Sequence, residues 1–290
     1  MGEIFDALSR AKDSPEDPPP QAPSTPSGIP GTEPSLPIDV VSSSGGDALP
    51  FDGGTKVELS TELMADWVAR AVVAAPASDA ASRFRHMAIR MRHILKESDG
   101  SMLAVSSANA GEGKTTTSCN LALALSSMST RGSVALVDGD LRSPRVAAAL
   151  GIDFEIGFDQ VLTGDAALAD ARVRTQFPSL DVYPSHCYGR DAHELLSDAW
   201  VAKVMSDLAT HYDAVILDCP PVLPVPDARL MAEYADACVL VVRAGATRAK
   251  ALEEALGYLE HAPVAGVFVN CLDRRGSGSY YYAYGADGGK

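Results

Sequence analysis

Residues 106–117, with the sequence SSANAGEGKTTT, combine the residue types that bind phosphate groups. Small residues let a loop turn its backbone N–H groups toward an anion, and a following helix adds the positive end of its dipole. In such a loop Lys114 reaches the outer phosphates of a nucleotide, and the hydroxyl of Thr115 can hold a magnesium ion. The usual pattern has glycine where this chain has Ala108, a difference of one methyl group. The segment therefore predicts a phosphate-binding loop.

Aspartates follow two later apolar runs. Asp138 and Asp140 lie in LVDGDLR, and Asp218 lies in VILDCPP. Because the carboxyl ends of parallel strands meet at one edge of a sheet, these carboxylates would lie beside the phosphate loop. There they can hold magnesium or accept a proton from an attacking hydroxyl. A single aspartate after a strand is more often a turn or cap residue. Aspartates after two strands, together with the phosphate-binding loop after a third, favour a phosphoryl-transfer site.

Four of the nine tyrosines lie in the last eleven residues, within the sequence GSYYYAYGADGGK. The glycines around them give this segment little prospect of packing aromatic rings into a core. An exposed cluster of this kind is either an accidental sticky surface or a substrate. The four residues are Tyr280, Tyr281, Tyr282 and Tyr284.

Short apolar runs separated by helix-length segments would position these groups. Near-continuous apolar strands indicate a parallel sheet that is covered on both faces. The fold class that we expect is α/β: a three-layer P-loop NTPase domain with a mostly parallel twisted sheet, preceded by a disordered Pro-rich segment. The six expected strands are residues 102–107, 133–138, 180–184, 214–218, 238–242 and 264–269.

Two helices are expected before the first of these strands. Apolar residues recur at helical spacing from about 61 to 72, and again from about Ser78. In the second helix arginines border the apolar stripe, which indicates either a packed helix with snorkelling arginines or a subunit contact, and we favour the packed helix. The apolar stripe consists of Phe84, Met87, Ala88, Met91, Ile94 and Leu95.

The chain divides into four parts. Residues 1–12 form a short amphipathic docking helix, and residues 13–54 are too rich in Pro, Ser and Gly to order themselves. Residues 55–275 form the P-loop domain with its N-terminal helices, and residues 276–290 are a flexible tyrosine-rich tail. No stretch approaches the length of a membrane span, and the start lacks the features of a secretion signal.

The composition limits the partners. Hydrophobic residues make up 46% of the chain, enough for a core. The net charge of -14 argues against nucleic acid as the main partner. Five scattered cysteines without metal-ligand spacing indicate reduced core residues of a cytoplasmic protein.

Taken in order, these motifs resemble those of the bacterial tyrosine kinases of capsule and exopolysaccharide synthesis, a branch of the ParA/MinD-like P-loop ATPases. The resemblance covers about residues 79–285. AVSSANAGEGKTTT matches the Walker A motif, LVDGDLR the additional Walker A′ motif and VILDCPP the Walker B motif. The tyrosine cluster is the fourth shared feature.

The resemblance implies an ATP-dependent tyrosine autokinase that uses Mg²⁺. Lys114, Asp138, Asp140 and Asp218 would be catalytic, and Thr115, Asp138 and Asp218 would hold the metal. The clustered tyrosines would be the phosphoacceptors. The implied nucleotide-binding residues are Asn109, Ala110, Gly111, Glu112, Gly113, Lys114, Thr115, Thr116 and Asn270.

Two departures from the family patterns matter. Asn109 stands where ParA and MinD relatives carry a second lysine, which favours the kinase branch. The helix from Ser78 lacks the Glu-x-x-Arg-x-x-Arg pattern that many kinase members use for ring assembly.

The resemblance also implies partners. These are a membrane polysaccharide co-polymerase that activates the kinase at the inner membrane, a tyrosine phosphatase, and further copies of the chain joined through the tail and the N-terminal helix. Two alternatives stay open: a ParA/MinD-like ATPase, and a nucleotide-gated adaptor without kinase activity.

Overall fold

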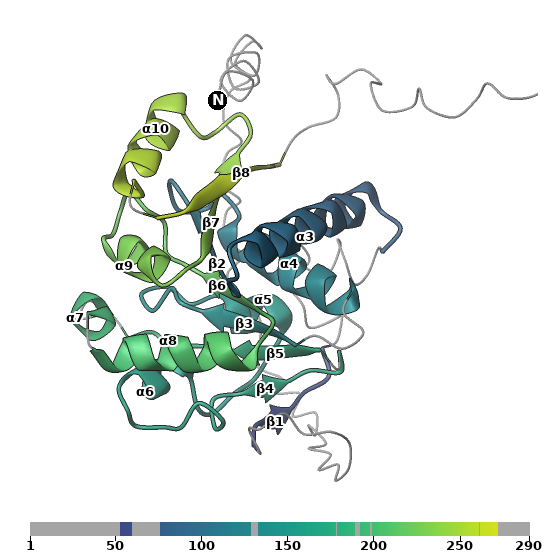
Figure 1. Ribbon diagram of the computed structural model, residues 1–290, viewed down its shortest axis with the longest axis vertical. Coiled ribbons are helices and arrows are strands. Elements are labelled where there is room, and N and C mark those ends of the chain that lie inside the picture. The colour runs from purple at the N-terminus through teal and green to yellow at the C-terminus, as the bar shows by residue number, and fades with distance from the viewer. Residues whose placement is uncertain are drawn as a thin grey trace, which may run out of the picture.

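The computed structural model describes residues 53–59, 76–128, 133–177, 179–188, 192–197, 199–260 and 262–271 (Figure 1). Several expected features lie outside these described residues. They are the docking helix at 1–12, residues 13–52 of the linker, the helix at about 61–72 and the tyrosine-rich tail at 276–290.

The described residues form one eight-stranded sheet with the order β1-β4-β5-β3-β6-β2-β7-β8. All neighbouring strands are parallel except the pair β4 and β5. All six strands expected from the sequence are present. The strands are β1 (Thr55–Lys56), β2 (Met102–Ser107), β3 (Val134–Asp138), β4 (Val173–Arg174), β5 (Leu180–Tyr183), β6 (Ala214–Asp218), β7 (Ala237–Arg243) and β8 (Val264–Asn270).

Helices cover both faces of the sheet, which confirms the three-layer architecture (Figure 1). One face packs against α3, α4 and α5, and the other against α6 to α10. The helices are α3 (Asp79–Glu97), α4 (Lys114–Met128), α5 (Val146–Leu150), α6 (Phe158–Leu162), α7 (Ala192–Leu196), α8 (Ala199–His211), α9 (Asp227–Glu233) and α10 (Ala249–Tyr258).

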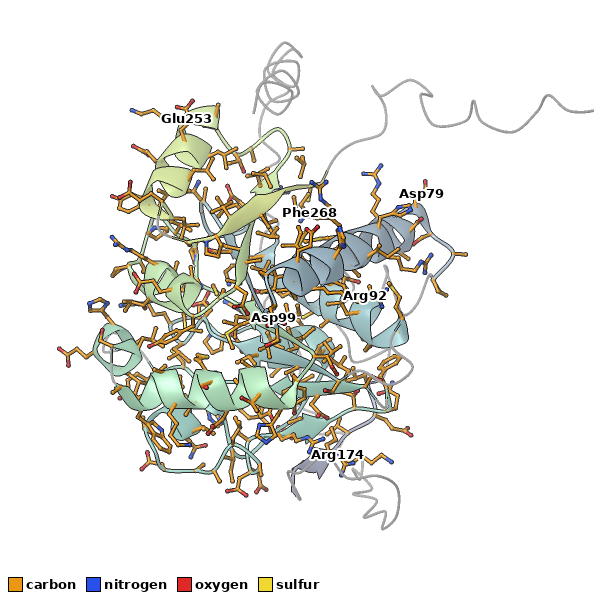
Figure 2. All side chains as sticks on the ribbon, in the orientation of Figure 1. Asp79, Arg92, Asp99, Arg174, Glu253 and Phe268 are labelled. Carbon is orange, nitrogen blue, oxygen red and sulfur yellow. The ribbon has the colours of Figure 1, made fainter. Side chains whose placement is uncertain are left out.

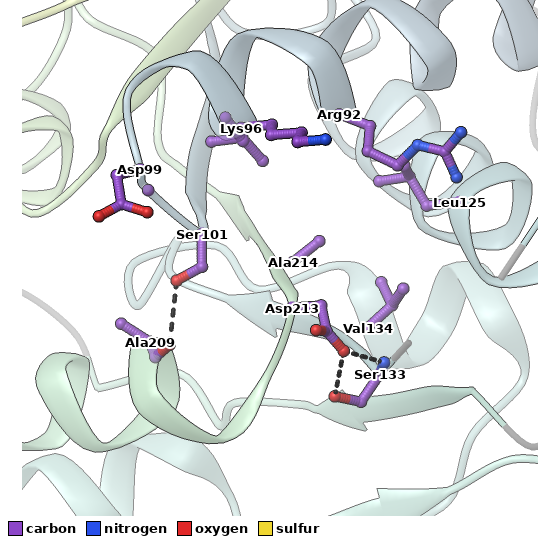
Figure 3. Close-up of a pocket in the computed structure, with 12 residues that line it drawn as sticks. Arg92, Lys96, Asp99, Ser101, Leu125, Ser133, Val134, Ala209, Asp213 and Ala214 are labelled. Carbon is purple, nitrogen blue, oxygen red and sulfur yellow. Dashed lines mark hydrogen bonds between the residues drawn. The ribbon is translucent and has the colours of Figure 1, made fainter. Parts of the chain in front are cut away.

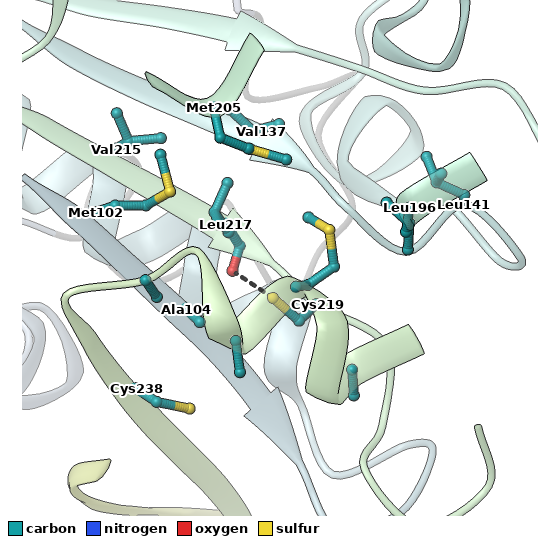
Figure 4. Close-up of a cluster of buried hydrophobic side chains, with 14 of the residues drawn as sticks. Met102, Ala104, Val137, Leu141, Leu196, Met205, Val215, Leu217, Cys219 and Cys238 are labelled. Carbon is teal, nitrogen blue, oxygen red and sulfur yellow. Dashed lines mark hydrogen bonds between the residues drawn. The ribbon is translucent and has the colours of Figure 1, made fainter. Parts of the chain in front are cut away.

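Alternation along each strand divides the core between these two layers. In β2, Leu103 faces one hydrophobic cluster, whereas Met102 and Ala104 face the other. Figure 4 shows part of the second cluster, in which Met205 of α8 lies near the strand residue Val215. Because successive side chains point to opposite faces of a sheet, strands covered on both faces are apolar throughout.

The helix expected from Ser78 is α3. Its N-cap Ser78 accepts a hydrogen bond from the backbone N–H of Ala81 at 3.1 Å. Ala81, Phe84, Ala88, Met91 and Leu95 are buried, so the stripe packs into the core as expected. Figure 2 shows Phe268 of β8 beside α3, where its ring stacks on Phe84 with 5.6 Å between centroids.

The structure differs from the sequence expectations at the edge of the sheet and in two cysteines. The two-residue strands β1 and β4 were not expected, because two residues are too few to show a periodic pattern. Cys119, Cys219 and Cys238 are buried, but Cys187 and Cys271 are exposed, so the expectation of core cysteines was wrong for these two. Both exposed cysteines follow the end of a strand, where the chain leaves the core.

Within the ranges that the structure describes, every helix is too short or too polar to cross a bilayer.

Candidate functional site

The phosphate-binding loop lies between β2 and α4, as the sequence predicted. Gly111 and Gly113 have φ angles of 80° and 99°, in the region that favours glycine. A Cβ atom on Gly113 would lie 2.0 Å from Nδ2 of Asn270, so a side chain at this position would displace the amide of Asn270. Ala108 is buried in the core, and its carbonyl oxygen accepts a hydrogen bond from the N–H of Leu223.

Lys114 is the first residue of α4 and contacts carboxylates from two other strand ends. Its Nζ lies 2.7 Å from Oδ2 of Asp140 and 3.8 Å from Oδ2 of Asp218. Burial by itself lowers the pKa of Lys114, but the negative charges of Asp218 and Asp140 outweigh burial and raise that pKa above its ordinary value. Lys114 is therefore held as a cation among carboxylates.

Asp218 is fully buried at the end of β6 and accepts hydrogen bonds from α4. The hydroxyl of Thr115 donates to Oδ2 at 2.6 Å, and the hydroxyl of Ser118 donates to Oδ1 at 3.0 Å. Burial raises the pKa of Asp218, while Lys114 and the two hydroxyls act in the opposite direction. Thr115 and Asp218 thus lie together, as a magnesium site requires.

Asp138 ends β3 directly beside Asp218, its partner in the sheet register. Oδ2 of Asp138 accepts hydrogen bonds from the backbone N–H groups of Arg145 at 2.9 Å and Val146 at 2.8 Å. Burial, and next the charge of Asp218, raise the pKa of Asp138 well above its ordinary value. Asp138 therefore fixes the loop that carries Asp140, while Asp140 itself turns toward Lys114.

The remaining predicted residues surround this centre. Asn270, at the end of β8, donates from Nδ2 to the carbonyl oxygen of Glu112 at 3.1 Å. Asn109 donates from its backbone N–H to Oε2 of Glu112 at 3.0 Å. Ala110 and Gly111 are exposed, and Thr116 is half-buried on α4. The phosphoacceptor candidates Tyr280, Tyr281, Tyr282 and Tyr284 lie outside the described residues.

Sequence reasoning missed several contributors. Ser118 follows Lys114 by four residues, and this helical spacing was a signal that placed its hydroxyl near the same site. Arg142 makes an ion pair with the buried Asp227, which joins the loop after β3 to the start of α9. Thr247 bonds Glu112 from 135 residues away. No local sequence pattern predicts either of these long-range contacts.

The oxygen atoms at this centre suit magnesium. A hydroxyl and carboxylates are the ligands that Mg²⁺ prefers, together with water and substrate phosphates. Within the described ranges, no group of three or more His, Cys, Asp or Glu side chains is arranged to hold a metal ion.

A cavity of about 480 Å³ lies at the opposite end of the sheet (Figure 3). Ser101, Val134 and Ala214 line it at the amino ends of β2, β3 and β6, together with Arg92 and Lys96 of α3. The candidate site lies at the carboxyl ends of these same strands. The cavity is therefore separate from the phosphate-binding loop.

Comparison with known proteins agrees with this geometry. Residues 100–261 match the family model described as AAA domain. The chain is 36% identical over 143 residues to tyrosine-protein kinase YwqD of Bacillus subtilis, a match that covers 49% of this chain and 60% of YwqD. It is 32% identical over 176 residues to tyrosine-protein kinase CpsD of Streptococcus agalactiae, which covers 60% of this chain and 76% of CpsD.

A solved structure resembles the same region. The kinase domain of the Escherichia coli tyrosine kinase ETK has a TM-score of 0.68 and 25% identity, covering 77% of this chain and 86% of that domain. The likeness in fold to the ETK kinase domain and the sequence match over most of CpsD thus point to the same group of proteins. The chain therefore belongs to the family that the AAA-domain model describes and to the bacterial tyrosine-protein kinases.

Proposed function

We propose that the chain is an ATP-dependent protein-tyrosine kinase that phosphorylates its own C-terminal tyrosines. The observation that carries the proposal is the position of Lys114, which lies at the start of the P-loop helix and contacts Asp140 and Asp218. The names of YwqD and CpsD support this reaction. Because the chain spans only 60% of YwqD, the activity of the whole relative is transferred here as a proposal.

The loop and its neighbours supply the ATP site. Backbone N–H groups of residues 110–116 would face the phosphates, Lys114 would offset their charge, and Asn270 would contact adenine. Thr115 and Asp218, with the nearby Asp138, would hold Mg²⁺, which would supply positive charge beside the phosphates. Thr115 and Asp218 are far apart in the sequence, but the hydroxyl of Thr115 donates a hydrogen bond to Asp218 in the folded chain.

Asp140 is the proposed base. The hydroxyl oxygen of a tyrosine attacks the γ-phosphorus of ATP, the bond from that phosphorus to the bridging oxygen breaks, and ADP leaves. The proton of the hydroxyl passes to the carboxylate of Asp140. We prefer Asp140 to Asp138, because Oδ2 of Asp138 accepts two backbone hydrogen bonds, whereas Asp140 accepts one, from Ser143, besides its ion pair with Lys114. The acceptors are Tyr280, Tyr281, Tyr282 and Tyr284.

Labelling with γ-labelled ATP and magnesium tests the proposal. We expect the purified chain to become labelled, and mass spectrometry to place the phosphate on the four tail tyrosines. Lys114→Met should abolish labelling, because it removes the cation that offsets phosphate charge. Lys203→Met is the matched control, since Lys203 is exposed on α8, where it pairs with Asp207 and lies over the ring of Trp200, away from the phosphate-binding loop.

Three outcomes would reject the proposal. Tyrosine labelling that persists in Lys114→Met would show that the P-loop does not perform the transfer. Release of phosphate without tyrosine labelling would favour a ParA/MinD-like ATPase. A partner that binds in response to ATP, with neither labelling nor hydrolysis, would favour the nucleotide-gated adaptor.

The partners are proposed on the family resemblance alone. A membrane polysaccharide co-polymerase would recruit the chain to the inner membrane, so that the kinase regulates capsule or exopolysaccharide polymerisation and export. A tyrosine phosphatase would reset the tail. Each phosphate adds about -1.5 to -2 charges, so tail phosphorylation should loosen an oligomer built through the tail. Light scattering before and after ATP treatment measures this, and an unchanged oligomer would contradict it.

A further inference from the structure

Glu112 is a buried carboxylate inside the phosphate-binding loop. Only 5% of the residue is exposed, which is rare for glutamate unless the charge has partners. Its Oε2 accepts the backbone N–H of Asn109 at 3.0 Å, which closes the loop on itself. Its Oε1 accepts the hydroxyl of Thr247 at 2.6 Å. Both carboxylate oxygens therefore act within the protein.

Thr247 lies in the turn between β7 and α10. Its Oγ1 also accepts a hydrogen bond from the backbone N–H of Arg243 at 2.8 Å. The hydroxyl is thus fixed by its own turn and directs its proton to Glu112. Thr247 connects the loop to the end of β7.

A second connection reaches the same residue of the loop. Asn270, at the end of β8, donates to the carbonyl oxygen of Glu112 at 3.1 Å. The strands β7 and β8 are neighbours in the sheet, and Arg243 and Asn270 are partners in their register. Glu112 is therefore held through its side chain by Thr247 and through its backbone by Asn270.

We infer that Glu112 and Thr247 are positioning residues that hold the phosphate-binding loop in its open, phosphate-accepting shape. Backbone N–H groups bind an anion well only when they already point toward it. Fixing a loop before binding increases affinity, because the ligand then does not have to order the loop. The inference rests on the proposed function, since it concerns the nucleotide site of the same kinase.

The geometry assigns Glu112 to positioning rather than to chemistry. A carboxylate directed at the phosphates would repel them, and the two oxygens of Glu112 are directed at Asn109 and Thr247 instead. What the loop needs from this side chain is a pair of hydrogen bonds. Glutamine provides an acceptor for the N–H of Asn109 and a donor for the hydroxyl of Thr247.

The test measures binding of the fluorescent nucleotide mant-ATP to the full chain in the presence of magnesium. Each titration is carried out at a temperature below the melting temperature of every variant. Thr247→Val keeps the shape of the side chain and removes the hydroxyl. We expect its affinity for mant-ATP to fall about ten-fold, as loss of a hydrogen bond to a charged group predicts. Thr247→Ser is the matched control, because serine restores the hydroxyl and should restore most of the affinity.

Glu112 provides the second half of the test. Glu112→Gln should bind mant-ATP more tightly than Glu112→Ala, since only the amide can replace both hydrogen bonds. The double variant Glu112→Ala, Thr247→Val should bind no more weakly than Glu112→Ala alone, because both changes break one connection. In labelling assays Thr247→Val should raise KM for ATP with little change in kcat.

The outcomes separate this inference from the proposed function. If the unaltered chain binds no mant-ATP, the proposed function fails. If it binds mant-ATP and Thr247→Val binds equally well, or if Thr247→Ser is impaired as much as Thr247→Val, the positioning role is wrong. Equal binding by Glu112→Gln and Glu112→Ala would also overturn it.

Discussion

The substitution Asp138→Asn should make the folded protein more stable at neutral pH while impairing phosphoryl transfer. Asp138 is fully buried, and burial together with the charge of Asp218 raises its pKa well above the ordinary value. Asparagine keeps an oxygen that can accept the backbone hydrogen bonds from Arg145 and Val146. It removes only the buried negative charge.

The stability difference between Asp138→Asn and the unaltered chain depends on pH. Well below about pH 3.9, the unfolded-state pKa of aspartate, the carboxyl is protonated in both states and the stability of the two proteins should be similar. As the pH rises through the raised folded-state pKa of Asp138, the unaltered chain loses stability relative to the variant, because the folded state binds this proton more tightly. The advantage of the variant therefore grows from acid to neutral pH.

The stability that Asp138→Asn gains depends on how far the pKa of Asp138 is raised in the folded chain. Each unit by which the pKa is raised corresponds to about 1.4 kcal/mol of unfolding free energy. Each kcal/mol of unfolding free energy that the variant gains should raise the melting temperature by roughly 2–4 °C in a domain of this size. The lost attraction to Lys114 subtracts little, because Asp218 and Asp140 raise the pKa of Lys114 more than Asp138 does.

Urea unfolding at several pH values from about 4 to 8 measures the effect. The control is Asp140→Asn in the same turn, which removes the negative charge from the 2.7 Å ion pair with Lys114 and should lower stability. A difference between Asp138→Asn and the unaltered chain that does not change with pH would refute the reasoning. Lower stability of Asp138→Asn at neutral pH would refute it as well.

Two further substitutions test the loop and the core. Gly113→Ala should abolish mant-ATP binding, because its Cβ would lie 2.0 Å from Nδ2 of Asn270 at a φ of 99°; Gly257→Ala, where an added Cβ meets nothing within 4 Å, should stabilise α10 by about 0.5–1 kcal/mol. Binding that survives Gly113→Ala would contradict the close contact. Tyr212→Phe should lower the unfolding free energy by about 1.5–3 kcal/mol, because its hydroxyl donates to Asp181 and bonds Tyr183. Urea unfolding of Tyr212→Phe beside the exposed control Tyr258→Phe measures this, and equal stability would count against the network.

The sequence predicted the parts of the site that depend on local pattern. Six apolar runs became strands because each packs against apolar side chains on both faces, although β8 at the edge of the sheet is only half-buried. The segment ending in Lys114 and Thr115 became a P-loop because its small residues precede a helix. Asp138 and Asp218 met at one edge of the sheet because parallel strands place their carboxyl ends together.

Contacts between distant residues were not predictable in this way. Glu112 and Thr247 are 135 residues apart, and their hydrogen bond depends on how the turn after β7 reaches the loop. Arg142 and Asp227 meet only because α9 begins beside the turn after β3. Nothing in the residue type or the local sequence of these four residues indicates a partner. Each partner becomes apparent only in the folded chain.

The division of labour between Asp138 and Asp140 shows the same limit most clearly. The sequence presents them as equivalent carboxylates two residues apart. The backbone N–H groups of Arg145 and Val146 hold Asp138, which leaves Asp140 to contact Lys114. Around that lysine the site has three carboxylates and one cation, so it has more negative charge than its own residues balance. Burial first, and then the charge of a neighbouring carboxylate, raise the pKa values of Asp138 and Asp218, and a divalent cation at Thr115 would favour their charged forms. The same buried charge that destabilises the free protein thus favours the ion that the proposed reaction needs.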